Sequence, residues 1–203
     1  MLTNHIHWNR LIKMHKGRLE AFSDGVIAIL ITIMVLELKA PHGASVDALQ
    51  PLIPLFLAYI LSYIYLGIYW SNHHHLMQAS EKVDGSVLWA NLHLLFWLSL
   101  FPFATSWVAE NSFQSIPVAC YGVVLLMAGV AYFILSQVLI SKHGKHSTLA
   151  KAVGSDFKGI ISVVIYGIAI PLACYSTWIA MALYILVAVL WLVPDRRIEK
   201  LVH

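Results

Sequence analysis

The residues best placed to do chemistry are the ionisable side chains just before the first long apolar segment. Arg18, Glu20 and Asp24 precede residues 25–36, a run of only twelve uncharged residues. A helix needs about 20 residues to cross a hydrocarbon layer of about 30 Å, so a helix here must draw Asp24, and with it Arg18, into or against the bilayer. Ionisable groups are costly there, and these two side chains are therefore candidate functional residues.

Three consecutive histidines would suggest a metal site in another context. Successive residues of a helix point about 100° apart, so His73, His74 and His75 cannot converge on one ion as residues four apart can. Cys120 and Cys174 each lie inside an apolar run, where they are expected to pack as free thiols. The sequence therefore predicts no metal site, no cofactor and no enzyme activity.

The charged residues are few and gather in short groups beside apolar runs. Of the 203 residues, 60% are hydrophobic and 11% are charged, a composition typical of an integral membrane protein. The net charge of +3 could suggest a nucleic-acid partner, but the position of the charges is better explained by membrane topology. We therefore expect contact with a lipid bilayer and no nucleic-acid partner.

Uncharged stretches predict six transmembrane helices in a single membrane domain that covers residues 1–203. The last run, residues 159–194, has 36 residues and would form a helix about 54 Å long, too long for one span. It is therefore expected to fold as two short helices joined by a turn at residues 171–176. The predicted fold is all-α, with helices at residues 18–38, 52–71, 86–108, 116–140, 158–173 and 176–193.

Lysine and arginine residues predict how these helices are oriented. With six spans, twelve of these residues fall on the side of the two termini, whereas Lys39 alone falls on the other side. Short cytoplasmic loops carry an excess of Lys and Arg, so both termini are predicted to be cytoplasmic. The expected location is the cell membrane, as a multi-pass protein.

The predicted first helix has two different faces. At about 100° per residue, Glu20 and Asp24 fall opposite an apolar stripe. The stripe contains Arg18, Phe22, Gly25, Ile29, Thr32, Ile33 and Leu36. Such a stripe faces lipid or protein in most membrane helices, and in some it lines a pore.

Asp24 needs a polar partner from another helix. The end of the second helix and the start of the third lie at its depth, and they contain Trp70, His73 and Asn91. An unsatisfied buried carboxylate is costly, so we expect Asp24 to bond to this cluster. The alternative is a helix cap formed by Ser23 and Asp24 at the membrane surface, with the preceding arginine among the headgroups.

Three segments in the first half of the chain form a recognisable pattern. Arg18 is followed after three residues by Phe22, Ser23 and Asp24. Tyr-Trp-Ser-Asn-His-His then occupies residues 69–74, Asn-Leu-His-Leu-Leu-Phe occupies residues 91–96, and Pro-Phe follows at residues 102–103. This pattern resembles bacterial members of the transmembrane protein 175 family of potassium channels. In the second half of the chain the resemblance rests on helix count alone.

The resemblance implies a homotetramer of six-helix subunits, in which four first helices surround a central pore permeable to potassium and other monovalent cations. Bulky apolar side chains form the constriction in such channels, in place of a carbonyl filter. Ile29, Ile33 and Leu36 would take these positions, and Thr32 would add a possible selectivity ring of hydroxyl groups. The other motif residues would form a structural interhelical network, made of Arg18, Phe22, Ser23, Asp24, Trp70, His73 and Asn91.

Two other functions stay open at the level of sequence. Eleven histidines and an intramembrane aspartate could form the relay of a proton-coupled secondary transporter. The repeated halves and interrupted helices of many transporters are not found, which favours a channel. A non-conducting membrane accessory subunit fits the composition equally well.

Overall fold

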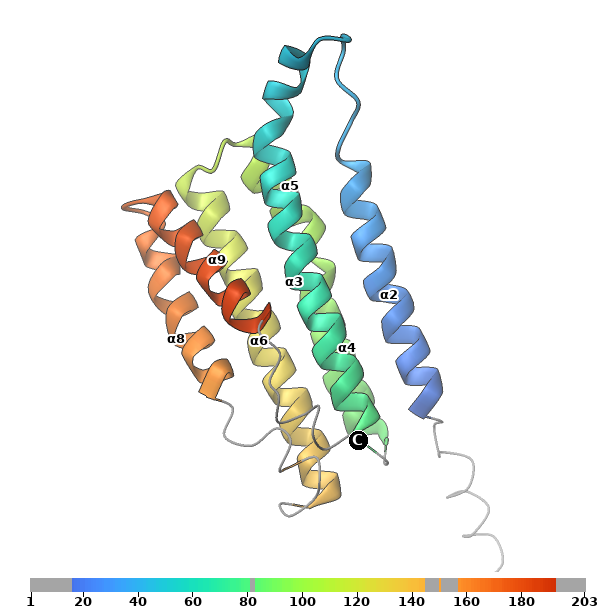
Figure 1. Ribbon diagram of the computed structural model, residues 1–203. Coiled ribbons are helices and arrows are strands. Elements are labelled where there is room, and N and C mark those ends of the chain that lie inside the picture. Colours follow the sequence, from blue (N-terminus) through green and yellow to red (C-terminus); the bar gives the residue numbers. More distant parts are fainter. Residues whose placement is uncertain (1–15, 81–82, 145–149, 151–156, 193–203) are drawn as a thin grey trace, which may run out of the picture.

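The protein is a bundle of helices, as the computed structural model shows for residues 16–80, 83–144, 150 and 157–192 (Figure 1). No strand occurs among these residues, and the predicted all-α class is confirmed. In chain order the elements are α2 (Lys16–Leu36), the 3-10 helix η1 (Val46–Leu52), α3 (Ile53–Gln78), α4 (Gly85–Ser99), α5 (Phe101–Glu110), α6 (Ser115–His143), α8 (Phe157–Leu172) and α9 (Thr177–Leu192).

The described part of the chain contains four long apolar spans and two shorter apolar helices. Four segments are long and apolar enough to cross a membrane, namely Lys16–Leu36, Val46–Gln78, Gly85–Glu110 and Ser115–His143. The helices α8 and α9 have 16 residues each and are therefore about 24 Å long. The last apolar run thus folds as two helices, and the chain turns between them at residues 173–176.

The third span is interrupted, although the sequence predicts one helix over residues 86–108. The helix α4 ends at Ser99 and α5 begins at Phe101, with Leu100 in a turn between them. Pro102 explains the break, because proline is poorly tolerated inside a helix but is accepted in the first turn of a new one. The Ala104 amide still donates to the Leu100 carbonyl at 3.0 Å, which keeps the two helices joined.

The second span extends further than its polar sequence suggests. The sequence predicts its end at Ser71, whereas α3 continues to Gln78. Its last turns bury His73, Leu76 and Met77 in the bundle, and tertiary packing of this kind stabilises helix beyond the apolar run. The remaining helix ends differ from the predicted ones by three residues or fewer.

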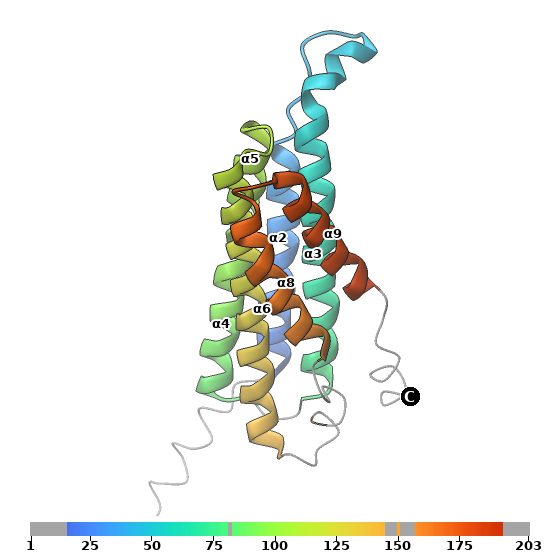
Figure 2. The ribbon, with the colours of Figure 1, turned by 90° about the vertical axis from the view of Figure 1, so that its left-hand side faces the viewer.

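The helix α2 lies along one side of the bundle, and α8 and α9 lie on the opposite side (Figure 1). It packs on α3, α4 and α5, while α6 contacts α4, α8 and α9. In both views η1 and the first turns of α3 project beyond the other helices (Figures 1 and 2). As a result, α2 has one face toward the bundle and one face away from it.

Candidate functional site

The helix α2 buries one face within the chain and exposes the other. The buried positions are Leu19, Ser23, Ile27, Leu30 and Met34. The stripe identified in the sequence is exposed along its whole length, at Arg18, Phe22, Gly25, Ile29, Thr32, Ile33 and Leu36. Ile29 is 57% exposed and Leu36 is 74% exposed, although both are apolar. The described residues therefore leave a long apolar surface of α2 uncovered.

Thr32 adds a hydroxyl group to this exposed face. Its Oγ1 donates to the carbonyl oxygen of Ile29, one turn earlier, at 2.8 Å. The bond uses the hydroxyl proton and leaves acceptor capacity on the oxygen. This side chain can therefore offer partial negative charge to a cation beside the surrounding apolar groups.

A chain of buried hydrogen bonds fixes the opposite face of α2 to two other helices. Asn91 Nδ2 in α4 donates to Ser23 Oγ at 2.9 Å, and Asn91 Oδ1 lies 2.7 Å from His73 Nε2 in α3. Because an amide oxygen only accepts, this contact requires the proton on Nε2 of the imidazole. Ser23 in turn donates to the Leu19 carbonyl at 2.9 Å. All three polar side chains are buried, so the chain sets the rotation of α2 against α3 and α4.

Asp24 has a separate contact from this buried chain. Trp70 Nε1 in α3 donates to Asp24 Oδ1 at 3.0 Å, and the indole stacks on the His74 ring with centroids 6.0 Å apart. The carboxylate is half-buried, and Trp70 is exposed. The polar cluster expected around Asp24 is therefore divided in the structure: Trp70 bonds to Asp24, whereas Asn91 bonds to Ser23 and links it to His73.

Arg18 and Phe22 lie outside both contacts. Each is exposed on the same face of α2 as the apolar stripe, and Arg18 makes no ion pair with the described residues. The nearby Lys16 pairs instead with Glu20, at 3.7 Å. The structure therefore does not bring Arg18 and Phe22 together with the other motif residues inside one chain.

The three consecutive histidines at the end of α3 also have different surroundings. His73 is buried in the hydrogen-bonded chain, whereas the rings of His74 and His75 meet edge-on with centroids 5.9 Å apart. In the described part of the chain, no three His, Cys, Asp or Glu side chains are placed to hold a metal ion. Cys120 and Cys174 are free thiols.

Sequence reasoning missed a second polar cluster in the centre of the bundle. Ser62 bonds through its hydroxyl to Thr105 at 2.7 Å and to Tyr121 at 2.9 Å, which joins α3, α5 and α6. Tyr166 in α8 donates to the Tyr65 hydroxyl at 3.1 Å. Hydroxyl residues inside apolar runs were the available signal, because a buried hydroxyl in an apolar bundle needs a partner.

Comparison with known proteins connects this arrangement to one family. The family model described as "Endosomal/lysosomal potassium channel TMEM175" matches residues 18–102. A potassium channel of Chryseobacterium sp. (strain P1-3) is 58% identical, over 92% of this chain and 97% of that protein. A potassium channel of Streptomyces collinus is 34% identical, over 57% of this chain and 60% of that protein.

A solved structure agrees with these matches across the whole bundle. It is the crystal structure of a lysosomal potassium-selective channel TMEM175 homolog from Chamaesiphon minutus, with a TM-score of 0.75 and 26% sequence identity. The match covers 87% of this chain and 95% of that one. The matched region of the family model also contains most of α2 and the partners of its polar face in α3 and α4. The chain therefore belongs to the TMEM175 family of ion channels.

Proposed function

We propose that four copies of this chain form a potassium-permeable cation channel whose central pore is lined by α2. The exposed apolar face of α2 carries the proposal, because α2 is fixed by its other face and leaves Ile29, Ile33 and Leu36 uncovered. The relatives named as potassium channels support the choice of ion. Closed cyclic symmetry would turn one exposed helix face per subunit into the wall of one pore.

The pore constriction would consist of three apolar layers. Ile29, Ile33 and Leu36 follow one another at intervals of four and three residues, and together span about 10 Å of helix. Apolar rings can close a pore by dewetting, because an ion stripped of water there meets no replacement ligand. The Thr-Val-Gly-Tyr-Gly segment of carbonyl filters is absent from the sequence. Thr32 hydroxyls are then the polar groups available to a partly dehydrated cation at this level.

The hydrogen-bonded contacts of Ser23 and Asp24 would have a positioning role. They act on the side of α2 that faces α3 and α4, away from the stripe. By fixing the rotation of α2, they would determine which side chains point toward the pore. Arg18 and Phe22 belong to the exposed face, so their contacts would come from neighbouring subunits.

We further propose a single membrane domain in the cell membrane, with both termini in the cytoplasm. The excess of Lys and Arg on one side supports this orientation. Lys16 and Gln78, at the ends of the first two spans, lie together at that side. The opposite end of α2 then leads to Glu37, where a carboxylate would raise the local concentration of cations.

Ion flux into liposomes containing the purified protein tests the proposal. Potassium flux should exceed sodium flux, and Ile29→Ala and Leu36→Ala should raise the flux or reduce its selectivity, because each widens an apolar ring. Ile185→Ala is the matched control, since Ile185 is exposed on α9, which lies on the opposite side of the bundle from α2 (Figure 1). Unchanged flux and selectivity in both α2 variants would contradict the constriction.

Native mass spectrometry tests the assembly separately. The expected mass is that of four subunits of 22.7 kDa each.

Disulfide cross-linking tests which helix faces the centre of the assembly. With Cys120 and Cys174 replaced by serine, Leu36→Cys should form intersubunit disulfides, whereas Leu186→Cys on α9 should not. A folded tetramer that carries no ion under any gradient would favour the transporter or the accessory subunit instead.

A further inference from the structure

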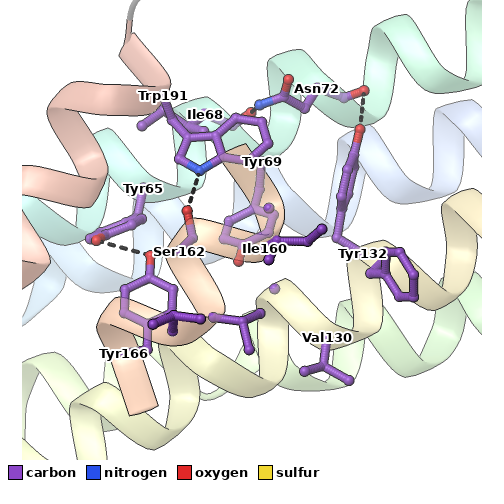
Figure 3. A pocket seen from close by; sticks show the side chains of 15 residues that line it. Tyr65, Ile68, Tyr69, Asn72, Val130, Tyr132, Ile160, Ser162, Tyr166 and Trp191 are labelled. Atoms are coloured by element: carbon purple, nitrogen blue, oxygen red, sulfur yellow. Dashed lines mark hydrogen bonds between the residues drawn. The ribbon is translucent and has the colours of Figure 1, made fainter. Parts of the chain in front are cut away.

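A pocket lies between α3, α6, α8 and α9 (Figure 3). The helices α8 and α9 lie on the opposite side of the bundle from α2 (Figure 1). Its volume is about 310 Å³, at the lower end of the range for small-molecule sites. Apolar and aromatic side chains form most of its wall, and the described residues that line it include no charged side chain. The pocket is therefore suited to an uncharged ligand.

Gly129, in the middle of α6, creates part of this space. A Cβ atom built there would meet Tyr69 Oη at 3.8 Å, which is ordinary contact. Gly122 lies about two turns earlier on the same helix. A Cβ atom built there would overlap Tyr184 and Ile170. Gly122 thus permits close packing of α6 against Tyr184 and Ile170. The missing side chain at Gly129 instead leaves open space in the pocket.

Among the described residues, each polar side chain that lines the pocket has a hydrogen-bond partner except Tyr69. Tyr132 donates to the Asn72 carbonyl at 3.3 Å, and Trp191 donates to Ser162 Oγ at 2.9 Å. Tyr69 is 9% exposed, and its hydroxyl makes no hydrogen bond with the described residues. Figure 3 shows its ring reaching into the centre of the pocket. The unbonded hydroxyl belongs to a side chain that lines the pocket, so it is available to a ligand group there.

The mouth of the pocket faces the hydrocarbon region expected around the bundle. Phe133 in α6 and Ile160, Val163 and Val164 in α8 line the pocket and are also exposed. A ligand dissolved in the bilayer can therefore enter between α6 and α8 without crossing water. An apolar cavity of this kind favours an apolar ligand over water.

From these observations we propose that the pocket binds an uncharged single-chain alcohol from the bilayer. Its hydroxyl bonds to Tyr69 Oη, and its alkyl chain lies over Gly129 and leaves through the mouth between α6 and α8. The volume accepts one alkyl chain, and the absence of charged groups among the described lining residues disfavours a phospholipid headgroup. The site is separate from the proposed pore, so it does not depend on conduction.

Photolabelling of the protein in liposomes tests the site, with a diazirine-bearing long-chain alcohol as the probe. The label should reach Phe133 and Ile160, and unlabelled decanol should compete with it. Gly129→Leu fills the space and should abolish competable labelling. Gly167→Leu is the matched control, because the glycine lies on α8 with open space around its Cβ position, and it should label as the wild type does.

Tyr69→Phe tests the hydrogen bond while keeping the ring. It should weaken competition by decanol about threefold to tenfold, the value of one hydrogen bond, whereas Tyr63→Phe on the exposed side of α3 should have no effect. Gly129→Ala adds a single methyl group, so it should fold normally and bind decanol more weakly. Weaker binding by this folded variant would show that loss of pocket volume, rather than misfolding, reduces binding. The site is overturned if folded Gly129→Leu still labels at Phe133, if Tyr69→Phe competes normally, or if Leu186 on α9 labels equally.

Discussion

The two faces of α2 have similar apolar composition but opposite surroundings. Ile27 is 1% exposed and Ile29, two residues later, is 57% exposed. Lipid is as apolar as these side chains, so burial of the first face is explained by packing and polar contacts rather than by escape from water. Hydrophobicity alone cannot separate the two faces. The faces differ in that the chain packs one of them against its own helices and leaves the other uncovered.

The largest expected effect comes from shortening the same residue type on each face. Ile27→Ala should lower the free energy of unfolding by about 2–5 kcal/mol, because it opens a cavity in packed surroundings. Ile29→Ala should change it by less than about 0.5 kcal/mol, because its side chain lacks packed neighbours within the chain. Denaturant titration in detergent micelles measures both values.

Flux measurements on the same two variants should give the opposite order. Per folded tetramer, Ile29→Ala should alter potassium flux, whereas Ile27→Ala should conduct as the wild type does. Equal losses of unfolding free energy in Ile27→Ala and Ile29→Ala would show that the two faces of α2 do not differ in their packing within the chain.

The second prediction concerns the polar part of the buried face. Asn91→Ala should cost about 1–3 kcal/mol of unfolding free energy, because Ser23 and His73 both lose a partner while they stay buried. Asn111→Ala is the control, since that amide bonds locally to the Trp107 carbonyl, in the helix that Asn111 caps. Adding His73→Ala to Asn91→Ala should cost little more, and simple additivity would show that the two residues act independently.

The half-exposed hydrogen bond between Trp70 and Asp24 should contribute less to the free energy of unfolding. Asp24→Ala and Trp70→Phe should each cost about 1 kcal/mol, because the pair is partly open to its surroundings. Both variants should reduce the amount of tetramer, as judged by size-exclusion chromatography, more than they reduce flux per tetramer. Normal assembly combined with altered selectivity would place Asp24 in the permeation path instead.

The sequence predicted those features that depend on local spacing and on depth. Helical periodicity placed Ile29 and Leu36 on one stripe, and the described chain leaves that stripe exposed. Depth in the membrane brought Trp70 and Asn91 to the level of the motif on the first helix. Six apolar spans followed from run length, including the division of the last run into two helices.

Features that depend on neighbouring helices escaped sequence reasoning. The stop at Leu100 was signalled by Pro102, but the continuation of α3 to Gln78 depends on burial of His73 by other helices. The pairing of Asn91 with Ser23 rather than with Asp24 depends on how far each side chain reaches across the interface. No periodicity in one helix contains that information.

The smallest expected effect comes from an exposed contact, which contrasts with the buried chain at Ser23. Asp84 caps α4 by accepting from the Ser86 and Val87 amides, and its Oδ2 lies 2.6 Å from Lys142 Nζ in α6. The lysine and the Ser86 hydroxyl hold the pKa of Asp84 below its ordinary value. Both partners of the ion pair are substantially exposed, so the pair should contribute only about 0.2–1 kcal/mol.

This contribution should depend on pH in a defined direction. A lowered pKa in the folded state stabilises the fold above the unfolded value of about 3.9, and the gain is lost as pH falls below that value. Asp84→Asn keeps a capping side chain but removes the charge, so its stability deficit should be full at neutral pH and should shrink in acid. A deficit in Asp84→Asn that stayed constant in acid would assign the effect to the cap rather than to the charge.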